Sequence, residues 1–130
     1  MTPEAAVKYL ILIWSNPRSQ AAWEKLAEVQ RLEFGRSHGA FREELAASGE
    51  LLASEGLADP SSAKRVSVRE GITLTSDGPF AEVKEHLAGF YLIECSSMER
   101  AVELAARVPD AFFSEVEVRP VLDMRPWLES

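Results

Sequence analysis

Residues 7–14 read VKYLILIW, and this stretch decides the fold. It is rich in β-branched and aromatic residues, and residues 15–17, Ser-Asn-Pro, close it with a turn signal, so it is predicted to form a β-strand. Successive side chains of a strand point to opposite faces, and here both faces are apolar: Tyr9, Ile11 and Ile13 on one, Leu10, Leu12 and Trp14 on the other. Both faces of the sheet therefore need a cover.

In a small two-layer domain, helices cover one face of the sheet, and a second copy of the chain is the natural cover for the other. We therefore expect a homodimer that forms through the sheet face. Residues 19–48 supply the first helical segment, because their apolar and aromatic side chains recur at spacings of three and four. Gly35 and Gly39 each cost about 1 kcal/mol in a helix interior. The segment is predicted either to be two helices joined near Gly35 or one helix that a neighbouring backbone approaches closely.

The remaining chain alternates strands with one more helix. Strands are predicted at residues 51–53, 64–69, 72–75, 89–95 and 115–122, a short helical turn at 82–87, and a helix from Ser96 or Ser97 to Pro109. Glu70-Gly71 is a hairpin turn between two of these strands. This order is a βαββαβ split unit with an inserted β-hairpin, which is a ferredoxin-like α+β fold. We expect a single domain over residues 1–122 and a C-terminal tail over 123–130.

Composition excludes several classes of function. The chain has 21 acidic and 14 basic side chains, a net charge of −7, which disfavours nucleic-acid binding because that affinity comes from Lys and Arg. A single cysteine, Cys95, forms neither an intrachain disulfide nor a thiolate pair for a metal. The N-terminal residues lack a basic region followed by a long apolar run, so we expect no export and no membrane insertion. A cytoplasmic protein is the consistent interpretation.

Residues 75–85 read TSDGPFAEVKE and carry the densest chemistry of the chain. Asp77, Gly78 and Pro79 are a strong turn signal, because Asp bonds its own following backbone, Gly tolerates positive φ and Pro fixes φ. Four ionisable side chains in eleven residues exceed what a turn needs. We expect this loop to face a cleft.

This loop resembles the TDGPFAETKE signature of the DGPF branch of the YCII-related proteins. Residues 8–13, 89–93 and 116–121 agree with the same family, and the resemblance covers residues 7–122. The chain departs from the signature in two places: Val83 stands where Thr is usual, and Ser76 is inserted between Thr75 and Asp77. A role that relied on the Thr hydroxyl is therefore in question.

The resemblance implies a dimeric α+β barrel whose clefts hold a His and an Asp proposed as an acid–base pair. His38 matches the helical histidine of the family, and Asp77 is the best acidic candidate, so both are taken as candidate catalytic residues. Further residues of the loop and the first strand are expected to bind a ligand: Tyr9, Gly78, Pro79, Phe80, Glu82 and Lys84. The resemblance brings no settled reaction. Some members occur alongside extracytoplasmic-function sigma factors, and fold relatives include lactone isomerases and dehalogenases.

Each candidate has a plainer interpretation. His38 lies on the apolar stripe with Phe34 and Phe41 and is either a core-edge histidine or a general acid or base, since imidazole titrates near neutral pH. Asp77 is either a turn residue or the partner that orients the histidine. Glu82 and Lys84 suit a solvated surface cluster. Tyr9 and Tyr91 could add phenol groups to the cleft, although strand residues more often serve in packing.

Three functions remain open. The first is a cofactor-independent acid–base enzyme or binder of a small carboxylate or lactone-like metabolite. The second is a regulatory or ligand-sensing protein without catalysis, and the third is a loop that only builds the dimer. Two distant histidines without Cys partners are not a zinc signature, and the sequence contains no phosphate-binding glycine loop and no serine nucleophile elbow, so no metal or cofactor is expected.

Overall fold

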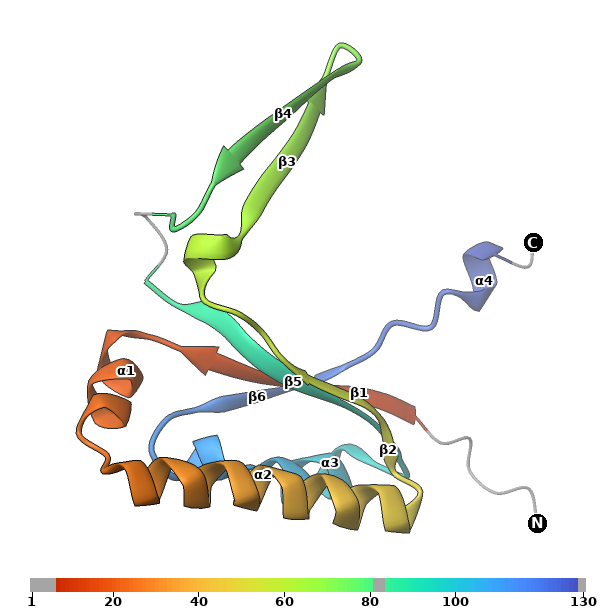
Figure 1. Cartoon of the computed structure of the whole chain (residues 1–130). Coiled ribbons are helices and arrows are strands. Elements are labelled where there is room, and N and C mark those ends of the chain that lie inside the picture. The colour runs from red at the N-terminus through yellow and green to blue at the C-terminus, as the bar shows by residue number, and fades with distance from the viewer. Residues whose placement is uncertain (1–6, 81–83, 129–130) are drawn as a thin grey trace.

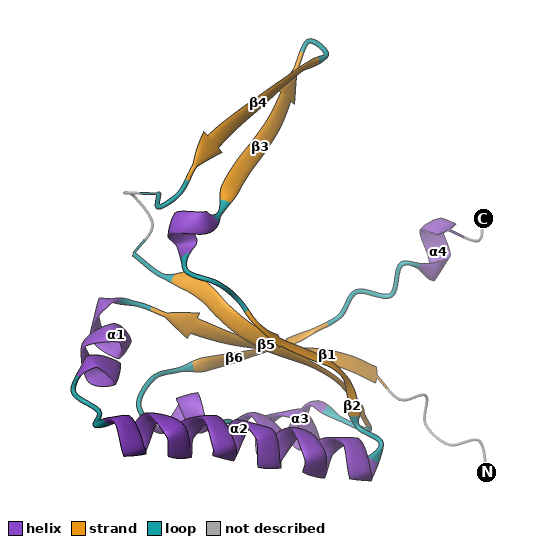
Figure 2. Cartoon of the chain, in the orientation of Figure 1, coloured by secondary structure: helices purple, strands orange, loops and turns teal. Residues whose placement is uncertain are grey.

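The computed structural model describes residues 7–80 and 84–128 of the 130-residue chain. Its strands are β1 (Val7–Ser15), β2 (Leu51–Gly56), β3 (Lys64–Arg69), β4 (Ile72–Asp77), β5 (His86–Cys95) and β6 (Val116–Pro120). Its α-helices are α1 (Pro17–Glu24), α2 (Glu28–Ser48), α3 (Met98–Ala105) and α4 (Arg125–Leu128). Two short 3-10 helices are η1 (Pro60–Ser62) and η2 (Pro109–Phe112). Figure 1 shows their arrangement, and Figure 2 separates helices from strands by colour.

The main sheet has four strands in the order β2-β5-β1-β6, and each neighbouring pair is antiparallel. Leaving out β3 and β4, the chain runs strand, helices, strand, strand, helix, strand, which is the βαββαβ order of the ferredoxin-like fold. The predicted α+β class is confirmed. The predicted hairpin is confirmed too: in the described part of the chain, β3 and β4 pair only with each other, and they project away from the sheet (Figure 1).

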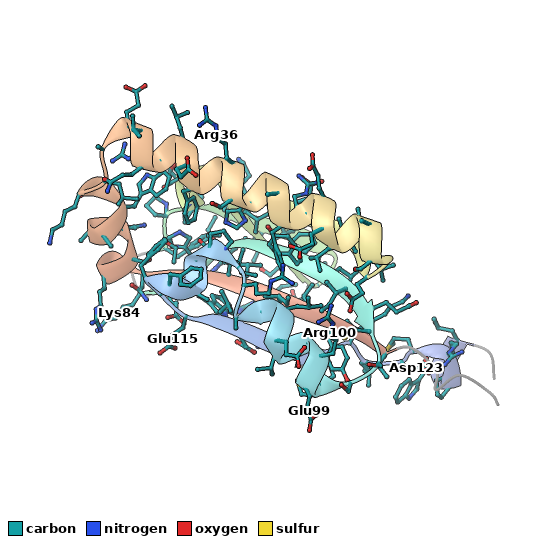
Figure 3. The ribbon with its side chains drawn as sticks, turned by 90° about the horizontal axis from the view of Figure 1, so that it is seen from below. Arg36, Lys84, Glu99, Arg100, Glu115 and Asp123 are labelled. Carbon is teal, nitrogen blue, oxygen red and sulfur yellow. The ribbon has the colours of Figure 1, made fainter. Side chains whose placement is uncertain are left out.

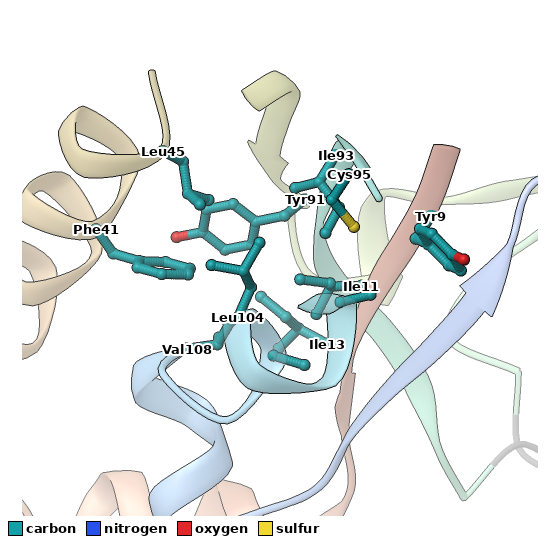
Figure 4. Close-up of a cluster of buried hydrophobic side chains, with 12 residues drawn as sticks. Tyr9, Ile11, Ile13, Phe41, Leu45, Tyr91, Ile93, Cys95, Leu104 and Val108 are labelled. Carbon is teal, nitrogen blue, oxygen red and sulfur yellow. The ribbon is translucent and has the colours of Figure 1, made fainter. Parts of the chain in front are cut away.

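Helices α2 and α3 cover one face of the sheet (Figure 1), and the core lies between the two layers. Strand β1 contributes Ile11 and β5 contributes Ile93, both fully buried, while α3 contributes Leu104. Figure 4 shows these side chains packed together. Charged side chains stay outside this layer, as Figure 3 shows for Arg36 and Glu99 on the helices. The apolar alternation of β1 is therefore satisfied on this face by the helices.

The first helical segment breaks earlier than predicted. Helix α1 ends at Glu24 and α2 begins at Glu28, so the joint lies at residues 25–27 and not near Gly35. The Arg31 guanidinium supplies a physical reason, because its Nη2 donates to the carbonyl oxygens of Trp23 at 3.1 Å and Glu24 at 3.4 Å, at the end of α1. The alternative of a close backbone approach is also wrong, since a Cβ added at Gly35 meets no atom within 4 Å.

Several other boundaries differ from the predicted ones. Strand β2 extends to Gly56, while β6 is shorter than predicted. The expected helical turn at 82–87 falls partly on residues outside the described part of the chain, and its last residues, His86 and Leu87, belong to β5. Ser97 caps α3 as predicted, with its Oγ accepting from the Arg100 N–H at 3.1 Å.

The predicted C-terminal tail contains the short helix α4, which extends away from the sheet (Figure 1). Within residues 7–80 and 84–128, no helix is both long enough and apolar enough to cross a membrane.

Candidate acid–base site

His38 lies between two partners that come from distant parts of the chain. Its Nδ1 lies 2.6 Å from the hydroxyl oxygen of Tyr91, and its Nε2 lies 2.7 Å from Oδ1 of Asp110. Both distances are those of good hydrogen bonds. The three side chains therefore form one hydrogen-bonded chain, which we call the Tyr91–His38–Asp110 relay.

Three different elements hold the relay. His38 is on α2, one turn before Phe41, which is buried against the sheet. Tyr91 is on the central strand β5 and is almost fully buried. Asp110 is in η2, directly after the buried Pro109 that starts this short helix. Because each element is anchored in the core, the relay is part of the folded framework.

The chemistry of the partners fixes the tautomer of His38. A carboxylate oxygen only accepts hydrogen bonds, so Asp110 requires the proton of a neutral imidazole to be on Nε2. Nδ1 is then the acceptor, and the Tyr91 hydroxyl donates to it. If Nδ1 gained a proton, the resulting imidazolium would face the Asp110 carboxylate, which stabilises the positive charge.

Tyr91 is held in its neutral form. Burial raises the pKa of its phenol to about 12, and the nearby negative charge of Asp110 acts in the same direction. A phenol with that pKa remains a hydrogen-bond donor throughout the physiological range. Tyr91 therefore donates a hydrogen bond to Nδ1 of His38 and keeps its proton.

Aromatic rings surround the relay. Phe34 meets the His38 ring edge-on, with 4.9 Å between ring centroids, and Phe34 in turn contacts Trp23 at 5.2 Å and Phe113 at 5.6 Å. These contacts hold the His38 ring in one orientation, since edge-to-face packing is directional.

The relay lies in the wall of a cavity of about 750 Å³. The side chains of His38 and Asp110 keep 23% and 17% of their surface exposed, so both are accessible from this space. The cavity is bounded by β1, α1, α2, β2, β5 and the η2 region. Its size is that of a site for a small organic molecule.

The polar part of the cavity wall consists of hydroxyls and carboxylates. Among the described residues, the wall contains no Lys or Arg, and its carboxylates belong to Glu24, Glu55, Asp59 and Asp110. Its hydroxyls include those of Ser15, Ser19, Ser54 and Ser114. The wall is thus rich in hydrogen-bond acceptors and negative charge.

The structure does not bring His38 and Asp77 together. Both ring nitrogens of His38 are taken by Tyr91 and Asp110, whereas Oδ1 of Asp77 lies 3.1 Å from Nζ of Lys64 across the exposed hairpin. The pairing expected from the sequence is therefore not formed within the chain. The carboxylate that holds the His38 tautomer is Asp110.

Four other candidate residues of the loop also lie outside the cavity wall: Gly78, Pro79, Phe80 and Lys84. Gly78 packs against the η1 segment, where its N–H donates to the Ala63 carbonyl at 2.8 Å. The Arg65 guanidinium stacks on the Phe80 ring, 3.9 Å from its centroid. Pro79 and Lys84 are exposed, and Lys84 lies on the outside in Figure 3. Glu82 is outside the described residues, so its ligand-binding role stays a prediction, as do those of the others.

Tyr9 is part of the core and not of the cavity. Only 6% of its surface is exposed, and it belongs to the same buried cluster as Ile11 and Ile93 (Figure 4). The plainer interpretation of Tyr9, as a packing residue of the strand, therefore describes its position.

Sequence reasoning missed Asp110 and undervalued Tyr91. The motif Pro109-Asp110 looks like a simple helix stop, and no local pattern links it to His38. Tyr91 alternates regularly with its strand neighbours, so it is typical of a packing residue. Within residues 7–80 and 84–128, no group of three or more His, Cys, Asp or Glu side chains is placed to hold a metal ion.

Two comparisons with known proteins agree with this structure. The family model described as "YCII-related domain" matches residues 7–125. A protein of Rhizobium meliloti (strain 1021), described as uncharacterized, is 33% identical over 120 residues, which cover 91% of this chain and 94% of that protein.

Proposed function

Because this chain belongs to the family of YCII-related proteins, we propose that it binds a small metabolite in the cavity and performs acid–base chemistry on it with His38. The observation that carries this proposal is the Tyr91–His38–Asp110 relay in the cavity wall. It resembles the general arrangement of a base oriented by a carboxylate. Nδ1 of His38 is the proton-accepting atom.

The relay suits removal of a proton next to a carbonyl group. A ligand that displaces the Tyr91 hydroxyl from Nδ1 meets a free lone pair on a histidine whose other nitrogen is fixed by Asp110. The displaced Tyr91 hydroxyl remains a donor and can bond the carbonyl oxygen where negative charge develops. The protein's own side chains thus supply a base (His38), a hydrogen-bond donor (Tyr91) and a carboxylate that balances the positive charge of the protonated base (Asp110).

Of the two ligand classes expected from the sequence, the lactone-like class fits the cavity better. A carboxylate ligand is normally held by Arg or Lys, and the described wall offers neither. A neutral ring with a carbonyl group needs only donors and apolar surface, which the aromatic side chains and serines supply.

Deuterium exchange tests this proposal. Small lactones and ketones are incubated with the protein in deuterated water, and incorporation at the carbon next to the carbonyl is followed by NMR. We expect exchange with the unchanged protein and a loss of at least about a hundredfold in His38→Gln. His86→Gln is the matched control, because His86 is not in the cavity wall and should leave the rate unchanged. Equal rates in the His38 and His86 variants would rule out the proposed role.

We further propose that the protein is a homodimer through the sheet face opposite the helices. On that face Leu12 is paired with Phe90 and Leu10 with Leu92, which makes an apolar strip on the two central strands. Leu10, Phe90 and Leu92 are only partly buried within one chain. Sedimentation tests this proposal: Leu10→Arg should give a monomer, whereas the exposed Leu32→Arg on α2 should remain dimeric.

A regulatory role is the second candidate, and the projecting hairpin favours it. Its apolar side chains are exposed, with Val66 at 64%, Val68 at 65% and Ile72 at 62%, which suits a protein contact. Association with a sigma-factor system would be one such role, as the DGPF-like loop that follows the hairpin suggests. If ligand binding survives in His38→Gln while Val66→Lys abolishes a partner contact, this candidate replaces the catalytic one.

A further inference from the structure

The aromatic content of the cavity wall indicates what the ligand looks like. Five aromatic residues whose side chains are not on the opposite sheet face line the same space as the relay: Trp14, Trp23, Phe34, Tyr91 and Phe113. They come from β1, α1, α2, β5 and the segment after η2, so the rings surround the space from several sides. Starting from the proposed function, we infer that the molecule bound here is an organic cation, with an ammonium group beside an apolar body.

The faces of aromatic rings attract cations. The negative quadrupole of an indole or phenyl face binds an ammonium group, most strongly when water is excluded, and Trp is the best such ring. The Trp23 ring already makes a cation–π contact with a side chain of the same chain, because the guanidinium carbon of Arg31 lies 5.2 Å from the centroid of the ring. Arg31 is not part of the cavity wall, so the ligand does not have to displace it.

The charges of the wall have the matching sign. Glu24, Glu55 and Asp59 are exposed residues of the wall, whereas Asp110 is partly buried beside His38. In the described part of the chain, no salt bridge involves Glu24, Glu55 or Asp59. An entering cation thus meets negative charge without having to break an ion pair at these three side chains.

Asp59 is fixed in its charged form. The backbone N–H of Ser61 donates to its Oδ1 at 2.9 Å, and this bond lowers the pKa of the carboxyl group. Lys64 contacts Asp77 and Arg100 contacts Glu50, so both cations are paired with carboxylates outside the wall. Neither of them occupies the position that an ammonium group would take beside Asp59.

The two halves of the site then have separate tasks. The exposed carboxylates of the wall and the aromatic faces hold the ammonium group, and the relay meets the reactive part of the same molecule. An amine with a nearby carbonyl satisfies both halves. A carboxylic acid satisfies neither, because it would place a negative charge among the carboxylates.

A matched series of probes tests the inference. Phenylpropylamine, phenylpropanol and phenylpropionate share one skeleton and differ in charge. Their binding is measured by tryptophan fluorescence in a Trp127→Phe background, which leaves Trp14 and Trp23, the two cavity tryptophans, as reporters. We expect the amine to bind about tenfold more tightly than the alcohol and to lose affinity as salt is raised, and the acid to bind most weakly.

Variants of the wall complete the test. Glu55→Gln with Asp59→Asn should weaken the amine about threefold to tenfold and leave the alcohol unchanged. Glu43→Gln is the matched control, since Glu43 is exposed on α2 and outside the wall, and it should change neither probe.

Equal affinities for amine and alcohol, or tighter binding of the acid, would overturn the inference about charge. The proposed function would survive that result, because a ligand would still occupy the cavity beside His38. Failure of all three probes to bind would also overturn the inference. The deuterium-exchange experiment then decides independently whether the proposed function stands.

Discussion

Nε2 of His38 lies 2.7 Å from Oδ1 of Asp110, although the two residues are 72 positions apart in the chain. This contact joins the helix layer to η2 at the edge of the cavity. It also decides which nitrogen of His38 is free to accept a proton, since the carboxylate holds the Nε2 proton. The chemistry of the site therefore depends on a residue that does not belong to the sequence motif.

In Asp110→Asn, His38 should no longer be held in a single tautomer. An amide can donate or accept, so the proton is no longer required to be on Nε2. Nitrogen-15 NMR of the imidazole should show a single Nε2–H tautomer in the unchanged protein and a mixture in the variant. Asp123→Asn is the control, because Asp123 pairs with Arg125 in the tail. An unchanged His38 spectrum in Asp110→Asn would mean that the carboxylate does not orient the ring.

Tyr91 should make the protein sensitive to alkali. Its pKa is about 12 in the folded chain against 10.0 for an ordinary tyrosine, so folding favours the neutral phenol. The resulting stabilisation is complete below pH 10 and is lost as pH rises toward 12, by up to about 2 kcal/mol. Urea unfolding across this window should show the loss. Tyr91→Phe should remove this part of the slope, whereas Tyr9→Phe should retain it.

The fold was predictable because its signals are local. The two-sided alternation of β1, the spacing of three and four along α2 and the Glu70-Gly71 turn each act within a few residues. His38 was selected by its place on the apolar stripe of α2 and by its match to the helical histidine of the family, and its catalytic role stays a prediction. The break between α1 and α2 was misplaced because its stabilising contact, from Arg31 to the end of α1, spans seven or eight residues across the joint and does not follow the spacing of three and four within a helix.

The loop at residues 75–80 shows what sequence motifs leave undecided. Its turn chemistry was recognised, but Gly78 is needed for a different reason than the positive φ that a glycine permits. A Cβ at Gly78 would lie 2.0 Å from the carbonyl oxygen of Pro60, so only glycine fits against η1. Such a contact between segments joined by a hairpin is not visible in the sequence.

Gly78→Ala should accordingly destabilise the protein. The added methyl group meets backbone, which cannot rotate away, so the hairpin base must shift at a cost of about 1–3 kcal/mol. Hydrogen exchange should become faster at the Gly78-to-Ala63 bond and in β3 and β4, while the central strands keep their protection. Unchanged exchange in the hairpin would contradict the close contact.

Gly35→Ala should have the opposite effect. Gly35 lies inside α2, and a Cβ there meets nothing within 4 Å, so the substitution brings only the higher helix propensity of alanine. The free energy of unfolding should rise by about 0.5–1 kcal/mol. Thermal and urea unfolding measure it. A loss of stability would show that a neighbour, such as a partner subunit, packs against this position.

Glu50 should make the protein sensitive to acid. Both of its carboxylate oxygens accept from Arg100, each at 2.9 Å, and Ser48 donates to Oε1 at 2.8 Å. The bonds from Arg100 lower the pKa of Glu50 below its ordinary 4.5. Folding therefore favours the charged form. Its contribution is complete above pH 4.5 and is lost as the pH falls through the lowered pKa in the folded chain.

Urea unfolding near neutral pH and at about pH 3 should reveal this loss in the unchanged protein. Glu50→Gln should lower the stability near neutral pH and reduce its fall toward acid, because the ion pair that links the end of α2 to α3 is already gone. The exposed Glu43→Gln on α2 should keep the full acid dependence. If Glu50→Gln and Glu43→Gln lose the same stability between the two pH values, the acid sensitivity arises elsewhere in the protein.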